Sequence, residues 1–346
     1  EEPRRAIEMA DLGLVAAERL DLVPIVCDLL ITRGSALCGL ARPYEGHALI
    51  RAGIDLAEEQ GLVPTAIRGR LNLGAILQDT DPRASFETSE AALEIATRLG
   101  MRSYARDLVG NAATAAIEVG EWDRSIREVS ASRDESLDER ARYYLRWVLA
   151  TFTAWRGEDV APEVERLAAW ADELNEPGAL GAVRGLRAEV AFAAGDLATA
   201  CDTWLDIAPG DALNAPRFCF QAGLAALMAS DPDRAAAALA AHEGTGQHAR
   251  LLGFDRRLLR AGLAALDGRR ADAIREAQAV ITEYERLGLP WRQALGTLML
   301  LSTVGAGEPE VRALAGPARE ILVRLGARPF LERLDAALRP EDPMTR

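Results

Sequence analysis

Histidine and cysteine are the side chains that most often bind metals or act as nucleophiles. The 346 residues include three histidines and four cysteines. His242 and His248 flank a short polar link, residues 243–247, which is typical of a solvated loop, and no His-Glu-x-x-His pattern occurs. The cysteines lie far apart in apolar helical stretches, at Cys27, Cys38, Cys201 and Cys219. This pattern predicts buried thiols in a reducing compartment, without disulfides or a metal site.

One run of carboxylates is spaced like a calcium-binding loop. Asp79, Asp81 and Glu90 would occupy its first, third and twelfth places. The fifth place holds Arg83, and the sixth holds Ala84 where the sharp turn needs glycine. We therefore predict no calcium site here.

The sequence contains no lysine, because all 40 basic residues are arginines. This excludes Schiff-base chemistry on lysine and the lysine of a P-loop. Gly178, Gly181 and Gly185 follow no strand pattern, so they do not indicate a dinucleotide-binding loop. No Gly-x-Ser-x-Gly elbow occurs either. We predict no catalytic residues, no cofactor and no enzyme activity, with an enzyme kept as a remote alternative.

The net charge and the distribution of charged residues indicate which kinds of partner the protein can bind. The net charge is -13, and the arginines alternate with Asp and Glu without forming a basic stripe. No apolar run reaches the roughly 18 residues of a membrane span. The sequence therefore predicts a cytoplasmic protein that binds neither nucleic acid nor membranes.

The composition favours helices. The chain holds 65 alanines, and only 5% of its residues are aromatic. Alanine, leucine, arginine and glutamate favour helices, whereas the residues that strands prefer are sparse. We therefore expect an all-α protein.

The sequence repeats with a period near 38 residues. Leu22-Val23-Pro24 recurs at Leu62-Val63-Pro64, and the segment 222–227 recurs letter for letter at 261–266. Glycines that would end helices recur at Gly61, Gly100, Gly288 and Gly326. Glycine fits the left-handed position after a helix because it has no Cβ.

Each unit is predicted to be a hairpin of two helices. A small residue near the middle of the first helix would let the second approach closely. The small residues are Gly34, Gly74, Ala113, Ala150, Ala188, Gly223 and Gly262. We expect about eight hairpins with a half-repeat at each end, stacked into a superhelix with a concave inner surface. This repeat domain spans 1–338, with a possible hinge at 130–138 and a disordered tail at 339–346.

The unit resembles the tetratricopeptide repeat. Ala188, Gly195, Leu197 and Ala200 match the spacing of that family's small and apolar positions. The resemblance implies a right-handed superhelix, a TPR-like α-solenoid whose groove binds a protein or peptide. Most units are longer than the usual repeat, which is typical of the stretched form in bacterial regulators.

The ending at 323–334, Val-Arg-Leu-Gly-Ala-Arg-Pro-Phe-Leu-Glu-Arg-Leu, is similar to the C-terminal helical-repeat region of large actinobacterial ATP-dependent regulators. These are LuxR-type regulators and adenylate/guanylate-cyclase proteins. The resemblance implies a non-catalytic interaction or regulatory scaffold domain of a larger signalling or transcriptional regulator. The alternative is a domain that senses a small-molecule effector. We expect the chain to be a piece of such a protein, so other domains of its parent chain are possible partners.

A candidate binding track follows from the repeat register. Residues six before each small residue should line the groove, with Trp147 beside them. These residues are Asp28, Arg68, Asp107, Tyr144, Arg217 and Arg256. Arginine grips carboxylate or phosphate through two parallel bonds, so we expect a partner with an acidic or phosphorylated group near an apolar one. Tyr144 also belongs to a stripe with Val148, Phe152 and Trp155, for which core packing is the alternative.

Overall fold

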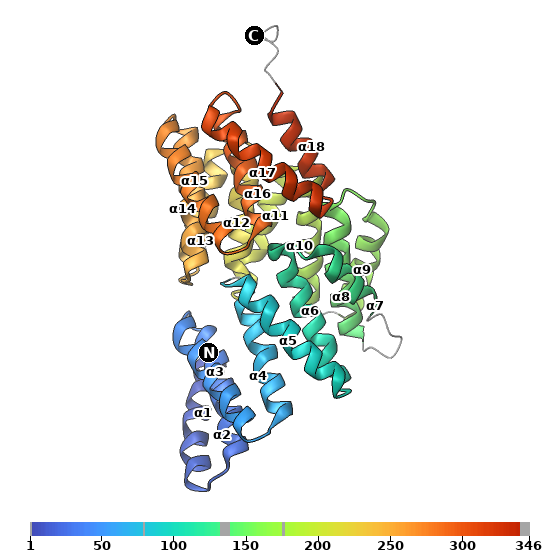
Figure 1. Ribbon diagram of the computed structural model, residues 1–346, viewed down its shortest axis with the longest axis vertical. Helices are drawn as coiled ribbons and strands as arrows, with labels where there is room; N and C mark the ends of the chain where they lie inside the picture. The colour runs from blue at the N-terminus through green and yellow to red at the C-terminus, as the bar shows by residue number, and fades with distance from the viewer. Residues whose placement is uncertain (1, 79, 132–138, 175–176, 340–346) are drawn as a thin grey trace. The chain divides into compact units, whose positions relative to one another are not determined.

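The computed structural model describes residues 2–78, 80–131, 139–174 and 177–339 (Figure 1). These residues form eighteen α-helices and one 3-10 turn, with no strand among them, which confirms the all-α prediction. The helices are α1 (Glu2–Arg19), α2 (Val23–Cys38), α3 (Pro43–Glu59), α4 (Val63–Leu77), α5 (Pro82–Arg98), α6 (Arg102–Val119), α7 (Trp122–Ala131), α8 (Glu139–Trp155), α9 (Ala161–Leu174), α10 (Pro177–Ala194), α11 (Leu197–Ile207), α12 (Ala215–Met228), α13 (Pro232–Gly244), α14 (Arg250–Leu266), α15 (Arg270–Arg286), α16 (Pro290–Val304), α17 (Pro309–Leu325) and α18 (Arg328–Ala337).

Local sequence signals set the helix ends. The Asp81 carboxylate accepts a hydrogen bond from the Ala84 amide at 3.1 Å and so caps α5 instead of binding calcium. Gly61 and Gly326 adopt φ angles of +66° and +68° just after their helices, and Gly100 and Gly288 adopt the same conformation. The predicted helix-stop glycines are therefore confirmed.

Consecutive helices pack as hairpins. The described helices alternate in the order expected for eight hairpins, α2/α3 through α16/α17, with α1 and α18 as the half-repeats. The two helices pack on each other in α2/α3, α4/α5, α8/α9, α10/α11, α12/α13 and α16/α17. The predicted close approach of the paired helix is confirmed at Gly34, where a Cβ would lie 2.7 Å from the Gly46 carbonyl oxygen of α3. Gly223 and Gly262 instead face the first helix of the neighbouring hairpin: a Cβ on Gly223 of α12 would lie 2.7 Å from Leu259 of α14, and one on Gly262 of α14 would lie 2.4 Å from Leu227 of α12. The structure is therefore an all-α solenoid of helical hairpins.

The chain divides into two compact units. Unit 1 comprises Glu1–Ala116, Arg127–Ser136 and Gly246–Leu252, and unit 2 comprises the rest. Of the predicted hinge, residues 130 and 131 belong to α7, whereas 132–138 lie outside the described residues. The predicted tail lies outside them from residue 340 onward. The single domain over 1–338 stays a prediction.

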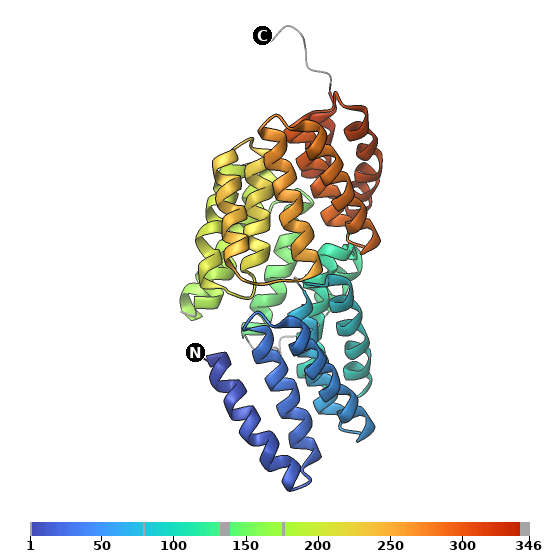
Figure 2. The same cartoon turned by 90° about the vertical axis from the view of Figure 1, so that its left-hand side faces the viewer.

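In unit 1, each of the helices α1 to α4 packs on the next one along the chain. Figure 2 shows α1 lying beside α2. Its core is assembled where successive hairpins meet. One cluster joins Ile50 and Ile54 of α3 to Leu73 and Leu77 of α4. Each hairpin thus buries its apolar face against the next, as expected of a solenoid.

The hairpin array of unit 2 closes on itself. The last helix, α18, packs against α16 and also against α8 and α10, which lie far earlier in the sequence (Figure 1). An aromatic cluster fills this contact: Trp155 stacks on Trp291 with centroids 4.7 Å apart, and Phe330 meets Trp291 edge-on at 4.9 Å. Arg333, in the middle of α18, ties this helix to the last turn of α10 by donating to the Phe192 carbonyl at 2.8 Å.

The cysteines lie largely in the core. Cys27, Cys201 and Cys219 are buried, and Cys38 is half-buried. Burial raises the pKa of the Cys38 and Cys219 thiols to about 11, so both are protonated at neutral pH.

Among the described residues, no helix has the length and apolar character needed to cross a membrane.

Candidate functional site

The predicted track residues divide between the two units. In unit 1, Arg68 Nη2 donates to Oδ1 of Asp28 at 2.9 Å and to the Asp28 carbonyl oxygen at 2.9 Å. Asp107 is exposed and accepts a hydrogen bond from Arg106 Nε at 2.9 Å. The Arg68 guanidinium is therefore already bonded to a carboxylate of its own chain.

The aromatic pair of the track lies in unit 2. The rings of Tyr144 and Trp147 stack with centroids 6.0 Å apart. Trp147 is buried, and its Nε1 donates to the Ala182 carbonyl of α10 at 2.9 Å. Tyr144 is 37% exposed, whereas Phe152 and Trp155 are buried. This stripe packs the interior, and only Tyr144 reaches the surface.

Arg217 and Arg256 are half-buried, because both lie against buried polar groups. Arg256 Nε donates to Nδ1 of His242 at 3.1 Å. Arg217 lies close enough to Glu118 and Glu189 for its positive charge to lower the pKa of both carboxyls, although burial raises each more.

The expectation that His242 belongs to a solvated link is wrong. His242 lies in the last turns of α13 and is fully buried. Burial lowers its pKa, and because Nδ1 accepts the bond from Arg256, the proton of the neutral ring is on Nε2. His248 does lie in an exposed link, with its ring 5.8 Å from that of Tyr44. A run of seven apolar residues, 235–241, precedes His242, and this was the signal for its burial.

Five ionisable groups meet inside unit 2, and we call them the inner charge network. Its members are Glu118 of α6, Glu189 of α10, Arg217 of α12, Asp255 of α14 and Arg292 of α16. All come from the first helices of their hairpins, so the network lies on the inner side of the array. Of these residues, the sequence analysis singled out only Arg217.

Arg292 is the centre of the inner charge network. Its guanidinium is 2% exposed, donates to Asp255 at 2.5 Å and to Glu118 at 3.2 Å, and lies 4.7 Å over the ring of Phe220. Burial opposes its charge, but the two carboxylates outweigh this and raise the pKa of Arg292. Tyr284 completes the shell by donating to Asp255 at 2.7 Å. A buried charge is tolerated only when it is paired and hydrogen-bonded in this way.

Glu189 is the acid of the inner charge network whose burial is least offset by hydrogen bonds and nearby positive charge. It is 2% exposed and accepts a hydrogen bond from Gln221 Nε2 at 3.0 Å. Burial raises its pKa to about 7, and the charges of Arg217 and Glu118 act in opposite directions on it. Glu189 therefore changes its protonation state close to neutral pH, inside the protein rather than at a surface open to substrate.

A hollow of about 380 Å³ lies beside α18, lined by Glu158, Glu332 and Arg333 among small and apolar residues. Arg333 is already engaged there by the carbonyl oxygens of α10. In the part of the chain that the structure describes, no group of three or more His, Cys, Asp or Glu side chains could hold a metal ion.

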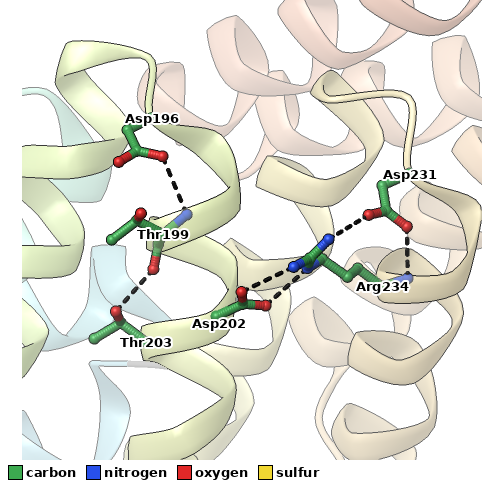
Figure 3. Close-up of polar contacts among 6 residues, drawn as sticks. All are labelled: Asp196, Thr199, Asp202, Thr203, Asp231 and Arg234. Atoms are coloured by element: carbon green, nitrogen blue, oxygen red, sulfur yellow. Dashed lines mark hydrogen bonds and ion pairs between the residues drawn. The ribbon is translucent and has the colours of Figure 1, made fainter.

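On the surface of unit 2, Arg234 joins two neighbouring second helices (Figure 3). It donates to both carboxylate oxygens of Asp202 on α11, at 2.7 and 2.9 Å, and to Asp231 at 2.8 Å. The hydrogen bonds from Arg234 lower the pKa of both aspartates. Asp231 also caps α13 by accepting from the Arg234 amide, so this cluster fixes the helix register.

An apolar surface lies at the start of unit 1. Six of the thirteen large apolar side chains that are exposed in the described residues lie between residues 9 and 25. We call the exposed side of α1, together with the residue that follows the helix, the α1 face; its apolar members are Met9, Leu12 and Val15 of α1 and the following Leu20. Leu22 and Ile25 continue it onto α2. Such a concentration of exposed apolar side chains marks an interaction surface.

No family model matches the sequence, and no curated protein matches it. The crystal structure of the tetratricopeptide-repeat domain of P58(IPK) is similar at 11% sequence identity and a TM-score of 0.22, with both chains covered in full. The described helices pack as an all-α solenoid of helical hairpins.

Proposed function

We propose that the chain is a non-catalytic protein–protein interaction module of a larger signalling or transcriptional regulator, and that it binds its partner through an outer helix surface. The α1 face supports this proposal, because Met9 and Leu12 leave 60% and 69% of their surfaces in water. Burying such side chains against a partner is favourable by about 25 cal/mol per Å² of apolar surface.

The inner track is the weaker binding surface in this proposal. Arg68 and Arg256 already bond to Asp28 and His242, so an acidic partner would have to replace these contacts. Tyr144 is the member of the track that still offers an exposed ring. Effector sensing is the second candidate function, and the hollow beside α18 supports it because the charged side chains of Glu158, Glu332 and Arg333 line a space of about 380 Å³.

A photo-cross-linking amino acid at position 12 tests the interaction module. The control places it at Val323 of α17, which is 59% exposed. In cells that make the protein, we expect position 12 to form a covalent polypeptide adduct that position 323 does not form. The captured polypeptide is then purified and titrated against the wild-type chain and Leu12→Ser, which should bind at least about tenfold more weakly. Equal capture at both positions would contradict the proposal.

A further inference from the structure

The repeat register shows which side of α1 carries the exposed apolar residues. Ala10 of α1 and Ile50 of α3 are 40 residues apart and are both buried. Ala17 and Ala57 share the same offset and are both buried. α1 therefore occupies the place of a second helix in its repeat, equivalent to α3.

A further stacked hairpin would leave this side of α1 uncovered. Leu12 and Val15 correspond to Ala52 and Asp55 of α3, which stay exposed although α2 and α4 both pack on α3. The corresponding residues of α5 are Ala91 and Glu94, and they are exposed as well. These positions face away from the neighbouring hairpins, so the occupant of the α1 face must approach from outside the array.

The exposed residues on the outer side of α1 form a pattern that is complementary to its own reverse. Glu8, Leu12, Val15 and Arg19 are spaced four, three and four residues apart, which places them in one narrow stripe along the helix. All four are exposed, and neither Glu8 nor Arg19 forms an ion pair with a described residue. Reversing the stripe exchanges glutamate for arginine and leucine for valine.

We propose that the partner at the α1 face is a second copy of this chain, an inference that rests on the proposed interaction function. The two copies bind through antiparallel pairing of their α1 helices about a two-fold axis. In this register Leu12 of one copy meets Val15 of the other, and Glu8 meets Arg19 on both sides. A two-fold contact uses the same patch twice, so a stripe that is complementary to its own reverse satisfies it. A parallel pairing would instead set Glu8 against Glu8 and Arg19 against Arg19.

The expected interface is small. One helix pair buries less than the roughly 800 Å² per partner of a standard interface, so we expect a weak, concentration-dependent dimer. Met9 and Leu20 flank the stripe and add apolar contact. The equivalent stripe of α5, Glu87, Ala91, Glu94 and Arg98, lacks the large apolar centre and should not pair.

Sedimentation velocity over a range of concentrations tests the pairing. We expect the wild-type chain to dimerise and Leu12→Asp to weaken the dimer at least about tenfold, because it places a charge at the apolar centre. The control Val323→Asp, at a similarly exposed site, should leave the dimer unchanged. A wild-type chain that stays monomeric, or a dimer indifferent to Leu12→Asp, would overturn the proposal.

Charge reversal tests the register. Because each copy contributes both charges, Glu8→Arg alone or Arg19→Glu alone alters two contacts and should weaken the dimer about tenfold. The double variant Glu8→Arg with Arg19→Glu should restore the affinity to within about threefold of the wild type. Failure of the double variant to restore it would refute the antiparallel register.

The cross-linking experiment separates this inference from the proposed function. An adduct at position 12 with the mass of two copies agrees with both. A monomeric chain that forms an adduct with a different polypeptide at position 12 would refute self-pairing and leave the interaction module standing. A monomeric chain without any adduct would refute both.

Discussion

At the scale of single residues, Arg292 is the side chain whose removal should lower the free energy of unfolding most. It neutralises Asp255 and Glu118 inside unit 2. Arg292→Met would leave both carboxylates without their buried partner, which typically costs about 3–5 kcal/mol. We expect urea unfolding to show a loss of that size. Arg275→Met is the matched control, because its side chain is 73% exposed and it should change stability by less than about 0.5 kcal/mol.

Glu189 should make the stability depend on pH near neutrality. Burial raises its pKa from 4.5 to about 7, so the folded chain binds more protons than the unfolded chain between these values. Its contribution to stability is therefore full below about pH 4.5 and is lost as the pH rises through about 7. Glu189→Gln should flatten this part of the profile by up to roughly 3 kcal/mol.

The measurement compares urea unfolding of both proteins from about pH 5 to about pH 8. Glu165→Gln serves as the control, because the Glu165 side chain is 75% exposed, and its profile should follow the wild type. Parallel profiles for the wild type and Glu189→Gln would show that Glu189 does not titrate in this range.

At the scale of helices, the close approach of α12 and α14 depends on two glycines. Gly223 faces Leu259, and Gly262 faces Leu227. Gly223→Leu or Gly262→Leu would overpack this contact and force the helices apart, at a typical cost of about 1–3 kcal/mol. Thermal unfolding should show a lower Tm for each variant.

Gly253 provides the control within α14, because a Cβ there meets nothing within 4 Å. Gly253→Leu should keep the wild-type Tm or raise it slightly, since glycine disfavours a helix. If Gly223→Leu and Gly262→Leu melt like Gly253→Leu, the close approach of these helices is not needed for stability.

At the scale of the molecule, unit 2 is held together by contacts between distant parts of the chain. Phe330 of α18 is fully buried and contacts Trp155, Phe192 and Trp291 from three other helices. Phe330→Ala should therefore destabilise unit 2 by about 3–5 kcal/mol. It should also speed amide hydrogen exchange in α8 and α10, although these helices precede it by more than a hundred residues.

Val323→Ala is the comparison for this effect, because Val323 is exposed on the neighbouring helix α17. Its exchange pattern in α8 and α10 should match the wild type. Faster exchange confined to α17 and α18 in Phe330→Ala would mean that α18 does not hold the array closed.

The sequence by itself determined the elements. The helix ends follow from local signals, as at Gly61 and Gly326, because a left-handed C-terminal position needs only the residue itself and its adjacent turn. The hairpins follow from the 38-residue period and from small residues such as Gly34, since a close helix contact excludes a side chain wherever it occurs. These signals span a few turns of helix or one repeat, and they are therefore legible in a single sequence.

Only the tertiary structure decided which charges meet. Arg292 pairs with Asp255 and Glu118, which lie 37 and 174 residues away, and no local pattern marks either partner. The burial of His242 and the closure of unit 2 by α18 depend equally on how strongly the array curves. Curvature accumulates from small rotations at every hairpin contact, so the polar residues that end up inside are set by the whole array rather than by any one repeat.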